Sequence, residues 1–344
     1  MDAGWPMRKP ATGVDAKEED GHVAAGYVGG HHAGAHHAGA HHAGTHHVDT
    51  HHAGMIDPAF TSKARRVWPP TMLLPAVVVM LALLAGPLIL IALTSVSTGP
   101  AGELGRGWTF AHFGRFLSDP YYRSVMLTTL RIGALVTGCS LLLAYPFAWW
   151  TLRQRGWLRA ALLFAALAPL MVTVSIRTLG WIVLLADNGP INALIALSGV
   201  VTGPVRMIYT EFAVVLGLIE ALLPFMILAV FTALQAIPRD VLRAAEIAGA
   251  TPRQRFFKVT LPLSLPGVAA GSVLVFTLAA SSFVTPRILG GGRTTTVANL
   301  VVDQFLVSLN WPFGAAIGVL LFAVIGAVMA LERAVSRRLP GGAS

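Results

Sequence analysis

Ionisable side chains are rare within the long apolar runs of this chain, so each of them is a candidate for chemistry. Glu220 lies eight residues past Phe212, well inside an apolar run. A charge at the centre of a bilayer costs at least ~2.5 kcal/mol unless it faces water or a partner. We therefore expect Glu220 to point into a helix bundle. There it either lines a wet path or forms an ion pair with Arg177 of the preceding run, and the sequence leaves both roles open.

Aromatic and acidic residues near the ends of the apolar runs also have two possible roles. Trp181, Phe283 and Trp311 either anchor at lipid headgroups, as interfacial aromatic residues commonly do, or line a path. Asp187 and Asp303 lie in loops between the runs, where each either faces an external partner or is solvated.

The sequence holds no pattern typical of an enzyme. Gly290, Gly291 and Gly292 follow an apolar run and lack the Lys and Ser or Thr of a phosphate-binding loop. His112 is the only histidine outside the N-terminal tail, so no nucleophile with a base and no metal constellation is evident there. Any energy source must therefore reside on another chain.

Paired histidines recur every five residues in the N-terminal tail. The candidate metal ligands among them are His31, His32, His36, His37, His41 and His42. Neutral imidazoles bind Zn, Ni or Cu, but nothing in the tail fixes their geometry, so we expect weak affinity at most. The Gly-, Ala- and His-rich composition offers no apolar face to bury, which predicts disorder over residues 1–66.

The composition argues against a water-soluble protein. Of 344 residues, 55% are hydrophobic and only 12% are charged, against about 25% charged in an average soluble domain. The formal net charge is +9, but the Lys and Arg residues lie in short clusters beside the apolar runs. That placement indicates membrane topology and excludes nucleic acid as a partner.

Six apolar runs are each about long enough to cross a hydrocarbon core, which predicts an all-α membrane protein. The predicted spans are 70–95, 125–152, 160–185, 212–234, 262–284 and 313–331. Residues 67–338 form the predicted transmembrane domain, and residues 339–344 form a short tail. Prolines within the runs predict kinked helices around a wet path.

The positive charges predict the orientation. One set of alternate flanks carries fourteen Lys and Arg residues and the other set carries six. Because positively charged loops stay on the cytoplasmic side, we expect both termini to be cytoplasmic.

The segment over residues 237–262, between the fourth and fifth predicted spans, is charged and predicts a helical hairpin. Residues 239–248 predict a short helix that Gly249 ends, because glycine adopts the left-handed conformation of a helix C-terminus. Thr251 and Pro252 then occupy the N-cap and first positions of a second helix along the membrane surface. Pro262 and Pro266 mark re-entry into the bilayer.

This segment resembles the EAA loop of permease subunits in binding-protein-dependent ABC importers. The positions that match the family signature are Ala244, Ala245, Gly249, Val259, Leu261 and Pro262. Arg243 stands where the family has Glu, so any salt bridge of that Glu is lost. The resemblance implies that the loop, with Ala250 and Pro252, docks into a cleft of a cytoplasmic ATPase. It would carry the motion of the ATPase to the membrane helices.

Further segments resemble the spermidine/putrescine branch of this family. They are IRTLGWIVLLADNGPINALI from Ile176, LPFMIL from Leu223, SSFVTPRILGGGRTTTVANLV from Ser281 and NWPFGAA from Asn310. The resemblance implies the MetI-like ABC importer permease fold in a bacterial inner membrane. It also implies three partners: a second homologous permease, an external solute-binding protein, and an ATPase dimer that holds the ATP and Mg. No cofactor is expected on this chain.

A polyamine is a flexible polycation, so its path needs carboxylates and aromatic faces. The candidate path residues are Arg177, Trp181, Glu220, Phe283 and Asp303. Putrescine, spermidine, an opine, a phosphonate and thiamine all stay open as the solute. An autonomous secondary transporter is the main alternative, but it would need inverted repeats and ion-binding carboxylates, and neither is evident.

Overall fold

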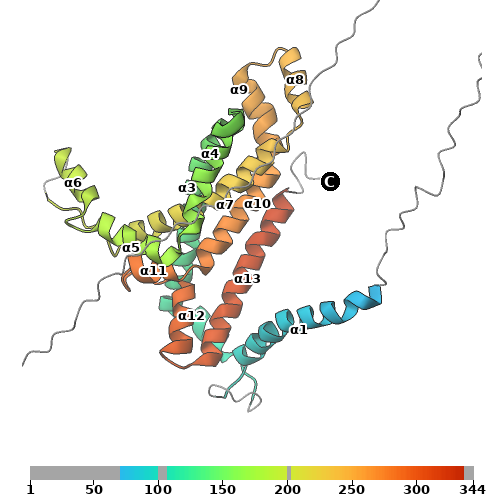
Figure 1. Cartoon of the computed structure of the whole chain (residues 1–344). Coiled ribbons are helices and arrows are strands. Elements are labelled where there is room, and N and C mark those ends of the chain that lie inside the picture. The colour runs from blue at the N-terminus through green and yellow to red at the C-terminus, as the bar shows by residue number, and fades with distance from the viewer. Residues whose placement is uncertain (1–69, 100–106, 200–202, 337–344) are drawn as a thin grey trace, which may run out of the picture. The chain divides into compact units, whose positions relative to one another are not determined.

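The computed structural model describes residues 70–99, 107–199 and 203–336, and most of these residues are helical (Figure 1). The predicted tails, including the six candidate histidines, lie outside the described residues. Thirteen α-helices are described, together with the 3-10 turn η2 (Ala168–Met171) and the π-turn η3 (Phe256–Thr260). The α-helices are α1 Pro70–Ser95, α2 Ala111–Ser118, α3 Pro120–Arg153, α4 Gly156–Leu167, α5 Val174–Leu185, α6 Pro190–Leu197, α7 Glu211–Gln235, α8 Arg239–Ile247, α9 Pro252–Arg255, α10 Leu261–Ser281, α11 Val284–Leu289, α12 Val297–Leu306 and α13 Trp311–Ser336.

Six segments are long and apolar enough to cross a membrane, which confirms the predicted number of spans. They are Leu74–Ser95, Pro120–Arg153, Val174–Leu197, Glu211–Gln235, Pro252–Ser281 and Trp311–Ala334. The second begins earlier than predicted because Asp119 caps α3, accepting a hydrogen bond from the backbone N–H of Tyr121 at 2.8 Å, and Pro120 takes the first helical position.

The prediction of one continuous third span over residues 160–185 is wrong. The chain forms α4, then η2 with Pro169 in its first turn, and restarts as α5 only at Val174. Pro169 cannot donate a backbone hydrogen bond, and Val172 and Thr173 are extended, so the helical ladder is interrupted. The third segment that is long and apolar enough to cross a membrane therefore combines α5 with α6.

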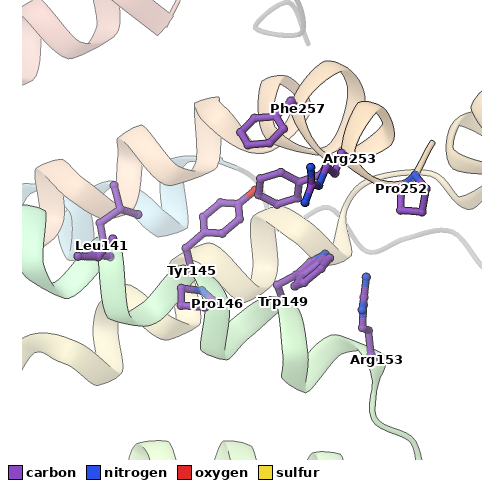
Figure 2. A pocket seen from close by; sticks show the side chains of 10 residues that line it. Leu141, Tyr145, Pro146, Trp149, Arg153, Pro252, Arg253 and Phe257 are labelled. Carbon is purple, nitrogen blue, oxygen red and sulfur yellow. The ribbon is translucent and has the colours of Figure 1, made fainter. Parts of the chain in front are cut away.

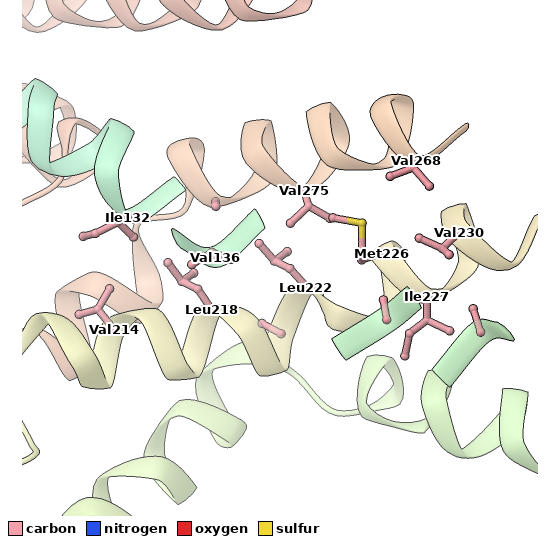
Figure 3. Close-up of a cluster of buried hydrophobic side chains, with 14 of the residues drawn as sticks. Ile132, Val136, Val214, Leu218, Leu222, Met226, Ile227, Val230, Val268 and Val275 are labelled. Atoms are coloured by element: carbon pink, nitrogen blue, oxygen red, sulfur yellow. The ribbon is translucent and has the colours of Figure 1, made fainter. Parts of the chain in front are cut away.

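Helices α3, α7 and α10 pack against one another and bury the main apolar core (Figure 3). Val136 of α3, Val214 and Met226 of α7, and Val275 of α10 are completely buried. Two glycines of α10 allow the close approach to α7. A Cβ atom on Gly271 would lie 2.5 Å from Cβ of Ala229, and one on Gly267 would collide with Cβ of Ala233. Small residues at this spacing bring helix backbones together in membranes.

A second cluster joins α2, α3, α12 and α13. Phe313 of α13 is fully buried, and its ring packs edge-on against Tyr122 of α3 at a centroid distance of 5.0 Å. The buried hydroxyl of Thr129 accepts a hydrogen bond from the backbone N–H of Val297 at 2.9 Å, which fixes the start of α12 against α3. In contrast, α1 exposes apolar side chains such as Met80 and Leu83. We expect these side chains to contact lipid or another apolar surface.

Candidate functional site

The predicted hairpin between the fourth and fifth spans is confirmed, and α8 is its first arm. Gly249 adopts a φ of +77°, and its backbone N–H donates to the carbonyl of Glu246 at 3.0 Å. The N–H of Ala250 donates to the carbonyl of Ala245, also at 3.0 Å. These two bonds form a Schellman motif, which requires a left-handed residue at the position of Gly249. The spacing from Ala245 to Gly249 and Ala250 is therefore set by the chemistry of the turn.

The second arm begins with a capping box. The hydroxyl of Thr251 accepts from the backbone N–H of Gln254 at 3.3 Å, and the Gln254 side chain accepts from the N–H of Thr251 at 2.9 Å. Pro252 holds the first helical position, where its missing N–H has no intrahelical partner to lose. The turn between the arms is thus fixed on both sides by local hydrogen bonds.

The second arm is not a separate surface helix, contrary to the prediction. From α9 the chain continues through the π-turn η3 directly into α10, and the whole stretch Pro252–Ser281 forms one candidate span. Pro262 and Pro266 therefore lie inside a continuous helical segment. The N–H of Leu261 donates to the carbonyl of Phe256, and this widened turn relieves the crowding that Pro262 brings to a regular helix.

The outer face of α8 is exposed and carries small and apolar side chains. Ile247 is 87% exposed and Val241 is 41% exposed, and Ala244 and Ala248 lie between them on the exposed side of the helix. Leu242 faces inward, against the main core. An exposed apolar side chain at the tip of a well-fixed hairpin is suited to insertion into a pocket of another protein.

Arg243, which stands in the Glu position of the signature, is exposed and makes only a long ion pair of 3.9 Å with Asp240. The pair that joins the two arms is instead formed by Glu246 and Arg255, at 2.8 Å. This pair was not predicted from the sequence. Its signal was the placement of opposite charges on either side of the Gly249 turn.

An aromatic cluster connects the base of the hairpin to α3 (Figure 2). The ring of Phe256 packs edge-on against Tyr145 at 5.8 Å and against Trp149 at 5.6 Å. The hydroxyl of Tyr145 lies 3.1 Å from that of Ser264 on α10. Val259, Leu261 and Pro262, the last positions of the signature, are half-buried in the same continuous helix. They belong to the packed base of the hairpin, whereas the α8 positions belong to its exposed face.

The structure brings two of the candidate path residues together. Arg177 on α5 donates from Nη1 to Oε1 of Glu220 on α7 at 2.9 Å. The Arg177 side chain is 12% exposed and that of Glu220 is 28% exposed. Trp181, one helical turn beyond Arg177, packs against the main core. The ion-pair alternative for Glu220 is therefore realised, and the Glu220 side chain stays partly exposed.

The other two candidates have different surroundings. Asp303 on α12 accepts from Nη1 of Arg287 on α11 with both oxygens, at 2.9 and 3.1 Å. Phe283 lies between α10 and α11 and is 44% exposed. A further ion pair, which sequence reasoning missed, joins Arg131 inside α3 to Glu211 at the start of α7. In the described ranges, no group of three or more His, Cys, Asp or Glu side chains is arranged to hold a metal ion.

Comparison with known proteins identifies a matching family and related sequences. Residues 71–340 match the family described as "Binding-protein-dependent transport system inner membrane component". The chain is 37% identical over 203 residues to the spermidine/putrescine transport system permease protein PotB of Haemophilus influenzae, covering 59% of this chain and 71% of that protein. It is 32% identical over 252 residues to PotB of Escherichia coli, covering 73% and 91%.

A solved structure shares the fold. A chain of a bacterial ABC transporter involved in the import of the acidic polysaccharide alginate superposes with a TM-score of 0.63 at 19% identity, over 78% of this chain and 94% of that chain. The six apolar helices and the extent of the family match identify a multi-pass protein of the bacterial inner membrane. The chain belongs to the family of inner-membrane components of binding-protein-dependent transport systems.

Proposed function

We propose that this chain is one of two permease subunits of an ATP-driven importer for a polyamine such as spermidine or putrescine. In this assembly an external binding protein delivers the solute and a cytoplasmic ATPase dimer holds the ATP and Mg. The permease itself carries out no covalent chemistry. The proposal of a polyamine is supported by the two PotB relatives, which are at least 32% identical to this chain.

The observation that carries the coupling role is the exposed apolar face of α8. Ile247 projects from a hairpin that is fixed by the Schellman motif and the capping box, so little conformational entropy is lost when it docks. The second arm is continuous with α10, which packs on α7 and α3. A displacement of the hairpin is therefore transmitted to the core helices through a continuous helical backbone. The proposed topology, with both termini in the cytoplasm, places this hairpin on the side of the ATPase.

We assign the solute path to the region around Glu220. Its side chain is more exposed than that of Arg177, with which it is paired, so an ammonium group of the solute can reach it. A carboxylate can accept several hydrogen bonds at once, so the ammonium group can bind Glu220 while Arg177 keeps its counter-charge. Trp181 and Phe283 are the proposed aromatic contacts, and Asp303 is proposed for the outer end of the path.

The coupling role is tested with Ile247→Asp and the matched control Ile247→Leu. Transfer of a carboxylate into an apolar cleft costs about 2 kcal/mol or more, which predicts at least a ~30-fold weaker association with the ATPase subunits. Co-purification with the ATPase and polyamine-stimulated ATP hydrolysis in proteoliposomes are the measurements. Ile247→Leu should retain both. Full activity of Ile247→Asp would contradict the assignment.

A further inference from the structure

An apolar groove of about 650 Å³ runs between the last turns of α3 and the start of the Pro252–Ser281 span (Figure 2). It is lined by Leu141, Leu142, Tyr145, Pro146, Trp149, Arg153, Pro252, Arg253, Phe256 and Phe257. Leu142 is 75% exposed and Phe257 is 63% exposed, so the apolar walls are open to the surroundings.

Two arginines mark one end of this groove. Arg153 is the last residue of α3, and its guanidinium lies 3.6 Å from the centre of the Trp149 ring. Arg253 approaches from α9. Within the described part of the chain, neither arginine has a carboxylate within 4.0 Å, whereas the neighbouring Arg255 is paired with Glu246. None of the described residues that line the groove is acidic, so the local charge is positive and uncompensated.

The wall that α3 contributes to the groove is about as long as one leaflet of a bilayer is thick. Arg153 ends one candidate span and Arg253 lies at the start of another, so we expect both guanidinium groups near the level of the headgroups. Leu142 is eleven residues before Arg153 in the same helix, which is roughly 17 Å deeper at 1.5 Å per residue. Half of a hydrocarbon core is about 15 Å thick. The apolar wall thus extends through the region that acyl chains occupy.

The sign of the charge selects the occupant. Two unpaired arginines repel a polyamine cation, so the groove does not fit the proposed solute. A free inorganic anion would leave the long apolar wall unused. A phosphate joined to acyl chains fits the whole groove. Arginine donates strong hydrogen bonds to phosphate, and the apolar side chains along the remainder of the groove can contact the acyl chains.

We propose that this groove binds one anionic phospholipid, with its phosphate held by Arg153 and Arg253 and an acyl chain lying along Leu142 and Pro146. The ring of Phe256 forms part of the groove and also contacts Tyr145 and Trp149. The bound lipid would therefore brace the base of the hairpin against α3. This site is independent of the identity of the transported solute.

The experiment uses the full chain in detergent, mixed with equal amounts of phosphatidylglycerol and phosphatidylcholine, and counts retained lipids by native mass spectrometry. The wild type should retain one phosphatidylglycerol in preference to phosphatidylcholine. Near a membrane surface each arginine contributes about fivefold to the affinity for an anionic lipid, so Arg153→Gln with Arg253→Gln should weaken retention on the order of 25-fold. Arg155→Gln removes an equal charge two residues from Arg153 without touching the groove, and should retain the lipid.

Two further measurements distinguish the phosphate of a lipid from free inorganic phosphate. Leu142→Trp fills the exposed apolar wall while leaving both arginines, and should lower retention of phosphatidylglycerol about as strongly as one arginine substitution. Inorganic phosphate at millimolar concentration should not displace the lipid. The proposal is overturned if phosphatidylcholine is retained equally well, if Arg155→Gln has the same effect as the double variant, or if free phosphate displaces the lipid. Unchanged retention in the double variant would also overturn it and would leave the groove as a protein interface.

Discussion

Nη1 of Arg177 lies 2.9 Å from Oε1 of Glu220, so an ion pair joins α5 to α7 within the helix bundle. The Nε atom of Arg177 is buried and has no partner among the described residues. Removal of the carboxylate would leave a nearly buried guanidinium without a counter-charge. The pair therefore has a structural role, whatever Glu220 does for the solute.

A charge swap separates the two roles of Glu220. Glu220→Gln should lower stability by about 1–2 kcal/mol, because it breaks a charged hydrogen bond in a membrane bundle. The double variant with Arg177→Glu and Glu220→Arg restores an ion pair with the charges exchanged. We expect it to recover thermal stability but not spermidine uptake, since the carboxylate has moved to α5. Recovery of uptake in the swapped variant would show that the pair only holds the helices together.

The Gly249 turn should be essential to coupling and dispensable for insertion. Proline at this position cannot adopt a φ of +77° and removes the N–H that donates to Glu246. Gly249→Pro should leave the chain in the membrane but abolish stimulated ATP hydrolysis and uptake. Gly249→Asn is the control, because asparagine tolerates the left-handed conformation, and it should retain most activity. Equal activity of the two variants would contradict the role of the turn.

Thr251 should stabilise the start of the second arm. Thr251→Ala removes the acceptor of the Gln254 N–H and should cost about 1 kcal/mol, whereas Thr251→Ser should be nearly neutral. Amide hydrogen exchange at Gln254 and Arg255 measures the effect locally. We expect exchange about fivefold faster in the alanine variant, since 1.4 kcal/mol corresponds to a tenfold change. An unchanged rate would mean that η3 and α10 hold this turn without the cap.

Local chemistry explains which parts of the hairpin could be predicted. Gly249, Thr251 and Pro252 act on backbone groups within a few residues, so their effect can be inferred from sequence alone. The Glu246–Arg255 pair depends on the arms folding back on each other, and the Arg131–Glu211 pair joins residues 80 positions apart. Such contacts are set by tertiary packing.

The third predicted span shows a different limit of prediction from sequence. Residues 160–185 carry no charged side chain apart from Arg177, so hydropathy does not distinguish one helix from two. Pro169 was predicted to kink a helix, but the chain leaves the helical conformation altogether at Val172 and Thr173. Neighbouring helices decide whether a proline bends a membrane helix or ends it. The number of spans could be predicted because it depends only on length and composition.

Close packing of α10 on α7 should make Gly271 intolerant of larger side chains. Gly271→Leu places atoms where Ala229 already lies, so the helices must separate and the melting temperature should fall. Gly138→Leu in α3 is the matched control, because a Cβ at Gly138 has no neighbour within 4 Å. Thermal unfolding of the two purified variants gives the comparison. A similar loss in both would point to a general effect on insertion.

The orientation of the hairpin decides whether an ATPase can reach it, and cysteine labelling determines it directly. The chain has a single cysteine, Cys139, so Cys139→Ser supplies a cysteine-free background. Ile247 is 87% exposed on α8, and Leu306 is 74% exposed at the end of α12. Ile247→Cys should react with a membrane-impermeant maleimide only after the cells are opened, whereas Leu306→Cys should react in cells with a permeable outer membrane. The excess of Lys and Arg on the α8 side of the membrane is the physical reason, because positively charged loops are retained in the cytoplasm. Labelling of Ile247→Cys from outside would place the hairpin beyond the reach of any cytoplasmic ATPase and would refute the proposed coupling.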